Sequence, residues 1–394
     1  MARHGIRDKV AIVGMGCTRF GELWDYSTED MLVEAVTDCL TSAGASAQDV
    51  DAYWLGTMDS GYSGLTLSTA LKTENRPVTR VENLCASGSE SLRAAVYAVA
   101  SGAYDCAMAV GVEKLKDSGF AGLVRRYPPD DGTAAETSAP AAFSYLAPAY
   151  QDAYDLDEPT MRKVLSHIAA KNHANGARNP RAQFRTAISA DAVSSSPIVA
   201  GSLGVLDCSG VADGAAAALV VRAEDAHKYT DRPMYVKALA LVSGSGTAIL
   251  DEQASFVTFP EVTACAADAY AQAGITDPRA QVSLAEVHDC FTPTELVLME
   301  DLGFSPRGTA WRDVLDGVFD HDGALPVNVD GGLKSFGHPI GATGLRMMFE
   351  CWLQFRGEAG ERQLPKPTLG LTHNLGGRPG SCVCFVGIVG SELS

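Results

Sequence analysis

The chain has 394 residues, a formal net charge of −17 at pH 7 and 20% charged residues. This length supports two or three domain-sized units, and the composition is typical of a soluble globular enzyme rather than a disordered or fibrous protein. The excess of acidic residues argues against non-specific binding to nucleic acid or to an anionic membrane, although it leaves room for a local basic patch.

Membrane, secretory and metal-binding segments are not expected. No run of about 18 apolar residues could span a bilayer, and residues 1–16 contain charges but no apolar core of a secretory signal. The ten cysteines are scattered singly, apart from Cys382 and Cys384, and show neither a disulfide framework nor a zinc-ligand spacing. We therefore expect a cytoplasmic protein with free thiols, without a metal site and without a permanently bound cofactor.

Short apolar runs alternate with helical patterns along the chain, which predicts an α/β architecture. The runs are continuously apolar rather than alternating, and this indicates strands that are covered on both faces. The predicted strands, in chain order, are residues 9–13, 105–110, 215–221, 235–242, 284–287, 368–372 and 382–389.

Two segments share one organisation and indicate an internal duplication. Residues 35–56 (AVTDCLTSAGASAQDVDAYWLG) and 266–287 (AADAYAQAGITDPRAQVSLAEV) each predict a helix that ends at a glycine, Gly44 or Gly274, followed by a polar loop and an apolar strand. Any two strand–helix–strand units share such features, so a chance likeness stays open as the alternative. A duplicated α/β fold is the better account.

The segment from about Lys116 to Leu206 interrupts this alternation. It is rich in Ala, Pro, Ser, Tyr and charged residues, and it predicts an inserted loop domain with helices of its own. We expect an N-terminal half over residues 1–115 that is completed by about 207–230, the insertion over 116–206, and a C-terminal half over 231–394.

Cys85 is the first candidate for a catalytic residue, at the start of a helical pattern that runs to about Ala100. The first amides of a helix are free and its dipole is positive there, so a thiol at this corner is expected to have a lowered pKa. Small neighbouring residues leave room for a substrate. A nucleophilic cysteine and a buried structural cysteine are equally supported by this segment alone.

His338 lies in GGLKSFGHPIGATG (residues 331–344), which has five glycines ahead of a predicted helix. A histidine fixed before Pro339 in such a turn can act as a general base towards a thiol or as a donor to a carbonyl oxygen. A dinucleotide site is weakly supported because the pattern GxGxxG after a strand is missing. A plain turn is the remaining alternative.

Two further segments carry weaker signals. EVHDCFT at residues 286–292 ends a predicted strand, and it places His288 and Cys290 on one face if the strand continues. THNLGGRPGS at residues 372–381 predicts a glycine-rich turn between two strands. Its amides could form an oxyanion hole, while a simple hairpin explains it equally well.

In this order, NLCASGSESLRAA, EVHDCF, GGLKSFGHPIGATG and THNLGG resemble the signature blocks of the thiolase superfamily. KNHANGARNPRAQF and VADGAAAALVV resemble blocks of its sterol-carrier-protein-type and archaeal or bacterial acetyl-CoA acetyltransferase branch, so the resemblance covers nearly the whole chain. It implies a duplicated, five-layered αβαβα fold with an inserted loop domain. It also implies reversible, CoA-dependent cleavage or Claisen condensation of 3-oxoacyl-CoA through an acyl-cysteine.

The resemblance assigns roles to single residues. Cys85 matches the cysteine that takes the acyl group, and His338 matches the histidine that activates it. His288 matches a position that shapes an oxyanion hole, and Cys290 matches the second catalytic cysteine, which is the acid and base for the α-carbon. The second oxyanion hole would consist of backbone amides, those of Gly376, Gly377 and Cys85.

The chain also departs from its relatives. Degradative thiolases carry their second cysteine in a Cys-x-Gly motif near the C-terminus, where this chain has residues 373–377, HNLGG. Cys382 and Cys384 follow in a predicted strand and are expected to pack as small apolar residues. Arg378-Pro379 and Val329-Asp330 replace residues that are usual near the substrate channel, so the acyl-chain specificity stays open.

The resemblance implies CoA esters as substrates and a homodimer or homotetramer, and some relatives work beside a small OB-fold, zinc-ribbon protein. Three alternatives remain. A decarboxylating ketoacyl synthase would lack the second cysteine, Cys290. An inactive thiolase-fold subunit would lose Cys85 or His338. A retro-aldol lyase would dispense with the Cys85-type nucleophile.

A basic run inside the insertion suggests a CoA site. Residues 161–185 contain no Asp or Glu, but they contain six cationic residues, Arg162, Lys163, Lys171, Arg178, Arg181 and Arg185. We expect Arg178, Arg181 and Arg185 to receive the phosphates of CoA, with Ser243 at the pantetheine. A basic face that docks on an acidic subunit or stays solvated is the alternative.

Overall fold

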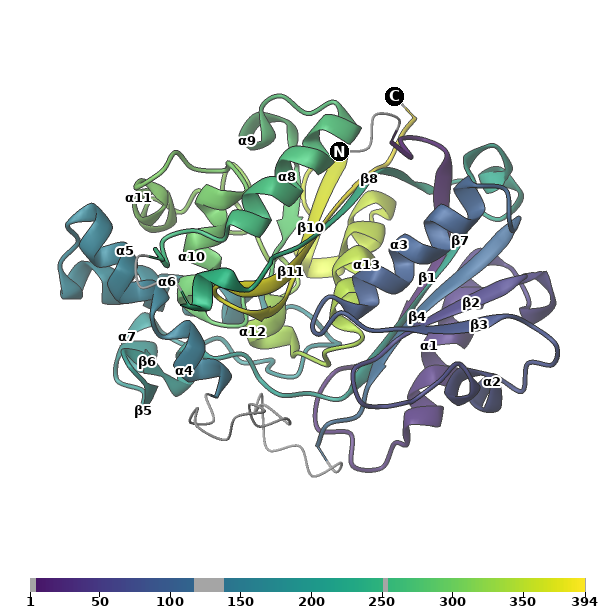
Figure 1. Ribbon diagram of the computed structural model, residues 1–394, viewed down its shortest axis with the longest axis horizontal. Helices are drawn as coiled ribbons and strands as arrows, with labels where there is room; N and C mark the ends of the chain where they lie inside the picture. The colour runs from purple at the N-terminus through teal and green to yellow at the C-terminus, as the bar shows by residue number, and fades with distance from the viewer. Residues whose placement is uncertain (1–4, 117–137, 251–253, 394) are drawn as a thin grey trace.

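The protein is described by a computed structural model that covers residues 5–116, 138–250 and 254–393 (Figure 1). Its centre is a sheet with the strand order β3-β2-β4-β7-β1-β8-β11-β10-β9. The strands are β1 (Val10–Cys17), β2 (Ala52–Gly56), β3 (Val78–Val81), β4 (Cys106–Glu113), β7 (Gly214–Arg222), β8 (Met234–Ser243), β9 (Leu284–Glu286), β10 (Leu369–Arg378) and β11 (Ser381–Gly390). All seven strands predicted from the sequence are present.

The sheet consists of two halves with the same topology, which confirms the predicted duplication. In the first half the order is β2-β4-β7-β1, and in the second it is β9-β10-β11-β8. In both halves the first of these pairings is parallel and the next two are antiparallel. The halves join where β1 and β8 pair at Ala11↔Tyr235 and Ile12↔Met234.

Matching helices connect the strands of each half. The first helices are α1 (Thr28–Ala43) and α8 (Pro260–Ala273), and they end at Gly44 and Gly274 with φ of 60° and 73°. Glycine adopts this left-handed conformation without a steric cost, as the sequence predicted. The second helices are α3 (Ser87–Ala100), which precedes β4, and α13 (Thr343–Arg356), which precedes β10.

These helices and half-sheets form five layers. Helices α3 and α13 pack against each other in the middle (Figure 1), and their apolar faces share one core with strands of both half-sheets. Helix α1 covers the outer face of the first half-sheet, and α8 covers the outer face of the second. Alternate residues of β7 illustrate the layering, since Ala216 and Ala218 belong to the central core while Ala215 and Ala217 face α1.

The segment predicted as an insertion packs on the second half. Buried residues such as Phe143, Tyr150 and Leu165 share a core with Phe291 and Leu298. Its described elements are α4 (Ala139–Phe143), α5 (Leu146–Tyr154), α6 (Glu158–Ala177), α7 (Ala190–Ser194), β5 (Ile198–Ala200) and β6 (Leu203–Gly204). Residues 117–137 of the predicted insertion lie outside the described residues. The domain boundaries given above stay a prediction.

Shorter helices complete the fold. They are α2 (Leu65–Leu71), α9 (Pro278–Gln281), α10 (Thr292–Asp301), α11 (Ala310–Leu315) and α12 (Gly332–Phe336). In the part of the chain that the structure describes, no helix combines the length and the apolar character needed to cross a membrane.

The ends of two strands differ from those predicted from the sequence. Strand β9 stops at Glu286, because the Val287 amide donates to the side chain of Asn328 (2.8 Å) and leaves the ladder. His288 and Cys290 are therefore not on one face of a continuing strand. Strand β10 runs through the predicted glycine-rich turn to Arg378, because it pairs residue by residue with β11, and the turn is only Pro379-Gly380.

Glycines let the turn that follows α12 enter the first half of the fold. The carbonyl oxygen of Gly341 lies so close to Gly88 and Gly111 that a Cβ on either would approach it to 2.5 or 2.2 Å. A Cβ on Gly341 itself would lie 2.3 Å from the Val112 oxygen and 2.6 Å from the Gly56 oxygen. These atoms belong to the backbone, so no side chain can move aside to relieve the contact.

We predict that Gly341→Ala lowers the free energy of unfolding by about 1–3 kcal/mol or more, the usual cost of overpacking, and reduces activity because the turn must shift. Gly102→Ala is the control, since its Cβ would meet nothing within 4 Å and its φ of +78° costs only about 1–2 kcal/mol. Urea unfolding of both variants measures the difference. An equal loss of stability, with full activity in Gly341→Ala, would contradict the close approach.

Candidate active site

Three predicted catalytic side chains meet where the halves of the fold meet. The sulfur of Cys85 and one ring nitrogen each of His288 and His338 all lie within 4.8 Å of one another. Cys85 precedes α3 in the first half, whereas His288 follows β9 and His338 follows α12 in the second. The imidazoles are 1% and 2% exposed, and the thiol is half-buried. The site therefore exists only when both halves are folded together.

The Cys85 loop is a tight turn onto the start of α3. Leu84 has φ of 52°, a left-handed conformation that is rare for a non-glycine residue. The Ser87 hydroxyl holds this turn, because it accepts from the Asn83 amide (2.9 Å) and donates to the Leu84 oxygen (2.6 Å). The backbone amides of Cys85 and Gly377 point at the thiol.

The expected lowering of the Cys85 pKa was wrong. Burial raises the pKa of the Cys85 thiol to about 12, and the charge of Glu113 adds to this, against smaller opposite effects of the two amides. Burial can shift a pKa by about 3–5 units. A helix terminus contributes only about 0.3–1 kcal/mol, which is less than one unit. The pKa shift caused by burial is larger than the shift caused by the helix terminus. The resting group is therefore a thiol, and it needs a base to lose its proton.

The hydrogen bonds of His338 leave one ring nitrogen free to accept a proton. The Thr343 hydroxyl donates to the Pro339 carbonyl (3.0 Å), so its oxygen can only accept from Nδ1–H of His338 at 2.8 Å. This assignment places the proton on Nδ1 and leaves a lone pair on Nε2. Nε2 is buried and has no hydrogen-bond partner among the described residues. The His338 amide donates to the Gly210 carbonyl (3.1 Å), which fixes the backbone.

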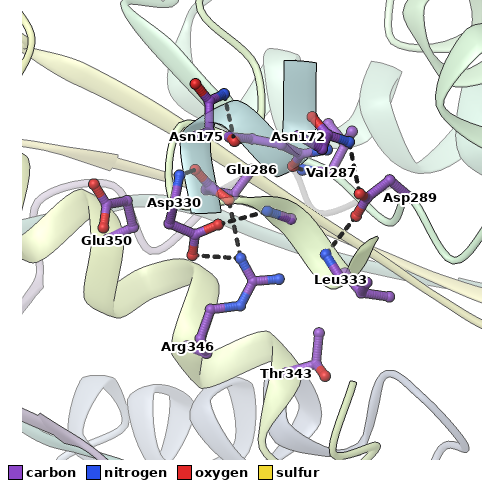
Figure 2. A network of polar contacts seen from close by, with 12 residues as sticks. Asn172, Asn175, Glu286, Val287, Asp289, Asp330, Leu333, Thr343, Arg346 and Glu350 are labelled. Carbon is purple, nitrogen blue, oxygen red and sulfur yellow. Dashed lines mark hydrogen bonds and ion pairs between the residues drawn. The ribbon is translucent and has the colours of Figure 1, made fainter. Parts of the chain in front are cut away.

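Burial keeps the imidazoles neutral, and a buried cation adds to this effect. Arg346 of α13 is 0% exposed and forms ion pairs with Glu286 (3.0 Å) and Asp330 (2.5 Å), as Figure 2 shows. Burial lowers the pKa of His338 to about 3, and the charge of Arg346 contributes. Thr343 and Arg346 lie one turn apart on α13, so this helix fixes the tautomer of His338 and adds to the lowering of its pKa.

His288 has the opposite tautomer. The side-chain amide nitrogen of Asn374 donates to Nδ1 of His288 (3.4 Å), and the Ser89 hydroxyl donates to the side-chain oxygen of Asn374 (2.6 Å). Nδ1 is thus an acceptor, and the proton belongs on Nε2. Burial lowers the pKa of His288 well below its usual value, with a further contribution from His338. The two rings are 5.3 Å apart and nearly perpendicular (87°).

Cys290 lies beside this cluster. Its side chain is 2% exposed, and its sulfur is 3.7 Å from the Thr294 hydroxyl. Burial raises the pKa of the Cys290 thiol well above its usual value, and Cys85 is close enough to add to the rise. Cys382 and Cys384, by contrast, are buried in the apolar core of the second half, as small apolar residues would be.

The two glycines predicted to form an oxyanion hole, Gly376 and Gly377, differ in where their backbone amides point. The Gly377 amide is the one that points at the Cys85 sulfur, and its φ of 105° favours glycine. A Cβ on Gly376 would lie 2.4 Å from the Asn83 oxygen, so this glycine lets β10 approach the Cys85 loop. Neighbouring amides of a strand point to opposite sides, which explains why the two residues do not contribute alike.

The basic run does not form one surface. Arg162 pairs with Asp207 and Lys171 with Glu295, each with a carboxylate that is at most 1% exposed. Arg181 donates to the Cys17 carbonyl and lies 3.6 Å from Asp38.

The other predicted CoA residues lie in different places. Arg178 is exposed at the end of α6, and Ser243 is exposed at the end of β8. Arg185 is exposed next to Phe184, whose amide donates to the Ser335 carbonyl (3.0 Å) three residues before His338. Only Arg185 is thus tied through the backbone to the His338 turn.

Several residues of the site were missed in the sequence. Thr343, Asn374 and Ser89 belong to the quoted motifs, so the signal was present but their hydrogen bonds were not predictable. Glu113 gave no signal beyond its place at the end of an apolar strand. His373 is buried next to Asn374, and neither of its ring nitrogens has a hydrogen-bond partner in the described part of the chain.

Comparison with known proteins places the chain in a family. It matches the family description "Thiolase, N-terminal domain" over residues 10–224 and "Thiolase C-terminal domain-like" over residues 243–386. It is 38% identical to the acetyl-CoA acetyltransferase of Methanothermobacter thermautotrophicus (96% of this chain, 98% of that one). It is 32% identical to human sterol carrier protein 2, covering 93% of this chain and 70% of that one.

Solved structures have the same fold. The Ltp2-ChsH2(DUF35) aldolase has a TM-score of 0.81 at 24% identity and covers 99% of both chains. Human mitochondrial 3-ketoacyl-CoA thiolase has a TM-score of 0.70 at 17% identity, with 98% and 99% coverage. At these identities the likeness concerns the fold alone. The αβαβα layering expected from the sequence is confirmed, and the chain belongs to the thiolase family of acyltransferases.

Proposed function

We propose that this chain is an acetyl-CoA C-acyltransferase that cleaves or forms 3-oxoacyl-CoA through an acyl group on Cys85. The observation that carries the proposal is the buried meeting of the Cys85 thiol with His338, whose Nε2 carries a free lone pair. The 38% identity to an archaeal acetyl-CoA acetyltransferase supports the same substrate class. The presence of Cys85 favours acyl transfer over retro-aldol cleavage.

The first half of the reaction loads Cys85. His338 Nε2 takes the thiol proton as the sulfur attacks the 3-oxo carbon of the substrate. When the tetrahedral adduct collapses, the bond between C2 and C3 breaks and the electron pair passes to the acetyl-CoA enolate. Cys290 then donates its proton to C2, which releases acetyl-CoA and leaves the acyl thioester on Cys85.

The second half transfers the acyl group to CoA. A base removes the proton of the CoA thiol, and the sulfur attacks the acyl thioester. The bond to Cys85 breaks, and the Cys85 sulfur recovers a proton from His338. The Cys290 thiolate left by the first half is the group beside Cys85 that can take the CoA proton, so both cysteines and His338 return to their starting states. Condensation is the reverse sequence.

Two sets of donors stabilise the negative oxygens. His288, with its proton on Nε2, would donate to the thioester oxygen of the enolate. The amides of Cys85 and Gly377 would donate to the oxygen of the acyl group on the sulfur, with Gly376 holding β10 in place. A pre-placed donor of this kind lowers a barrier by about 3 kcal/mol.

CoA is the substrate rather than a resident cofactor in this proposal. Of the residues predicted to hold it, Arg185 is supported by its place beside the His338 turn, and Ser243 by its exposure at the end of β8. The exposed Arg178 is a weaker candidate, and Arg181 is largely occupied by contacts within the fold.

A homodimer or homotetramer and a partner protein are further proposals. Strand β3 lies at one edge of the sheet. Two large apolar residues that precede it in the chain are exposed, Tyr62 (90%) and Leu65 (73%). An exposed sheet edge beside exposed apolar residues supports a subunit interface at this surface. The structure named Ltp2-ChsH2(DUF35) aldolase, which is similar to this chain, names two proteins. This supports a test for a small OB-fold, zinc-ribbon partner of this chain.

We predict that Cys85→Ala abolishes thiolysis of acetoacetyl-CoA and leaves the fold intact, because a methyl group replaces a half-buried thiol among small residues. Incubation of the wild type with acetyl-CoA should add one acetyl group to the peptide that contains Cys85, measured by mass spectrometry. Acetyl found on another cysteine, or full turnover in the variant, would refute the proposed nucleophile.

A second prediction concerns the acid and base. Cys290→Ala should still accept an acetyl group on Cys85 but lose at least about a hundredfold in carbon–carbon bond cleavage, the usual contribution of a general acid or base. The double variant Cys382→Ser/Cys384→Ser is the control and should remain active. Loss of cleavage in the control but not in Cys290→Ala would show that the acid and base has been misplaced.

A further inference from the structure

Glu113, the last residue of β4, is a buried carboxylate that the mechanism above does not use. Its side chain is 0% exposed and accepts six hydrogen bonds. One oxygen accepts from the Asp59 and Ser60 amides (both 2.9 Å) and from the hydroxyls of Thr57 (3.1 Å) and Ser60 (2.8 Å). The other accepts from the amides of Met58 (2.9 Å) and Gly341 (3.1 Å).

These contacts indicate an ionised carboxylate. The four amides can only donate. The Thr57 oxygen accepts from the Ser60 amide (3.0 Å), and the Ser60 hydroxyl oxygen accepts from the Lys114 amide (2.7 Å), while both hydroxyls also bond to Glu113. Each carboxylate oxygen accepts from two amides, and a protonated oxygen, with one lone pair left, could not accept from both. Burial raises the pKa of Glu113, but the donors oppose this rise.

The six donors come from both halves of the fold. Residues 57–60 follow β2 in the first half, whereas Gly341 belongs to the His338 turn of the second. One carboxylate therefore ties the turn that carries the base to the half that carries the nucleophile. It does so at the glycine contact where Gly341 approaches Val112, the residue before Glu113.

The same carboxylate acts on Cys85 through its charge. After burial, Glu113 is the largest cause of the raised Cys85 pKa, ahead of Glu82. The other titratable groups around the thiol are the neutral imidazoles of His288 and His338 and the protonated thiol of Cys290. Arg346 is already paired with two carboxylates. Glu113 is thus the charged group that most disfavours a thiolate at Cys85.

We propose that Glu113 is a positioning residue that ties the His338 turn to the loop after β2, in the half of the fold that carries Cys85, and that its buried negative charge keeps Cys85 a thiol until His338 accepts the proton. The inference rests on the proposed role of Cys85 as the nucleophile. A sulfur held in the thiol form is protected from electrophiles and oxidants, because the thiolate is the reactive form. The thiolate that does form is a stronger nucleophile, since nucleophilicity rises with the pKa of the thiol.

Two variants and a control test this proposal. Glu113→Gln removes the charge, and Glu113→Asp keeps it on a shorter side chain. Asp213→Asn is the matched control, because Asp213 is also 0% exposed and accepts from the amides of Leu23, Leu115 and Lys116 and from the Lys114 ammonium. The rate at which iodoacetamide alkylates Cys85 is measured by peptide mass spectrometry across a range of pH. Acetylation of Cys85 by acetyl-CoA is measured in parallel.

Glu113→Gln should alkylate about threefold faster at a given pH, because a thiol pKa lowered by one unit gives about tenfold more thiolate of about threefold lower nucleophilicity, and its pH profile should move to lower pH. Its acetylation should slow because the His338 turn is released. Glu113→Asp should keep the wild-type alkylation profile while acetylation slows. Asp213→Asn should keep the wild-type alkylation profile.

Three results would overturn the proposal. The first is an alkylation profile in Glu113→Gln that equals that of the wild type. The second is a profile in Glu113→Asp that moves to lower pH by the amount expected for Glu113→Gln. The third is a shift in Asp213→Asn as large as the shift in Glu113→Gln. If Glu113→Gln does not fold, the Glu113→Asp arm still tests the proposal, because a shift of its profile to lower pH would overturn it. Failure of wild-type Cys85 to accept acetyl would instead refute the proposed function, and the alkylation profiles distinguish the two cases.

Discussion

The site depends on a backbone contact between two distant parts of the chain. The turn that carries His338 reaches the first half of the fold because Gly88, Gly111 and Gly341 leave no side chains between their backbones. Gly344 continues the contact, since a Cβ there would lie 2.1 Å from the Ser89 hydroxyl and 2.5 Å from the Asn374 oxygen. The duplicated halves place α3 and α13 side by side, and the glycines bring their starts within reach of one another. Without this approach, Cys85 and His338 would belong to separate sites.

Burial then decides the chemistry of the groups that meet there. It raises the pKa of both Cys85 and Cys290 and lowers that of His288 and His338, so the resting site consists of neutral groups. Thr343 and Asn374 give the two imidazoles opposite tautomers, with the lone pair on Nε2 of His338 and the proton on Nε2 of His288. Two buried charges act on this neutral centre, because Arg346 opposes protonation of His338 and Glu113 opposes ionisation of Cys85.

Much of the fold was predictable because local sequence patterns determine it. The apolar runs gave the strands, and the C-terminal glycines of α1 and α8 gave the duplication. The predictions that failed concern features that depend on partners distant in the sequence. Strand β10 continues through its glycines because β11 pairs with it, and β9 ends early because Asn328 takes the place of a strand partner. The motifs identified Cys85, His338, His288 and Cys290, but their pKa values follow from burial, and the six donors to Glu113 come from two segments that no local pattern connects.

The central claim is that a neutral His338, and not the start of α3, activates Cys85. Rapid-mixing measurement of Cys85 acetylation by acetyl-CoA in wild type and His338→Ala tests it directly, with circular dichroism to establish that the variant is folded. The account predicts that the variant acetylates at least about a hundredfold more slowly, because a thiol with a raised pKa has lost the adjacent imidazole that has a free lone pair. An unchanged rate would contradict the account and would mean that the helix terminus and the amides of Cys85 and Gly377 activate the thiol without a base.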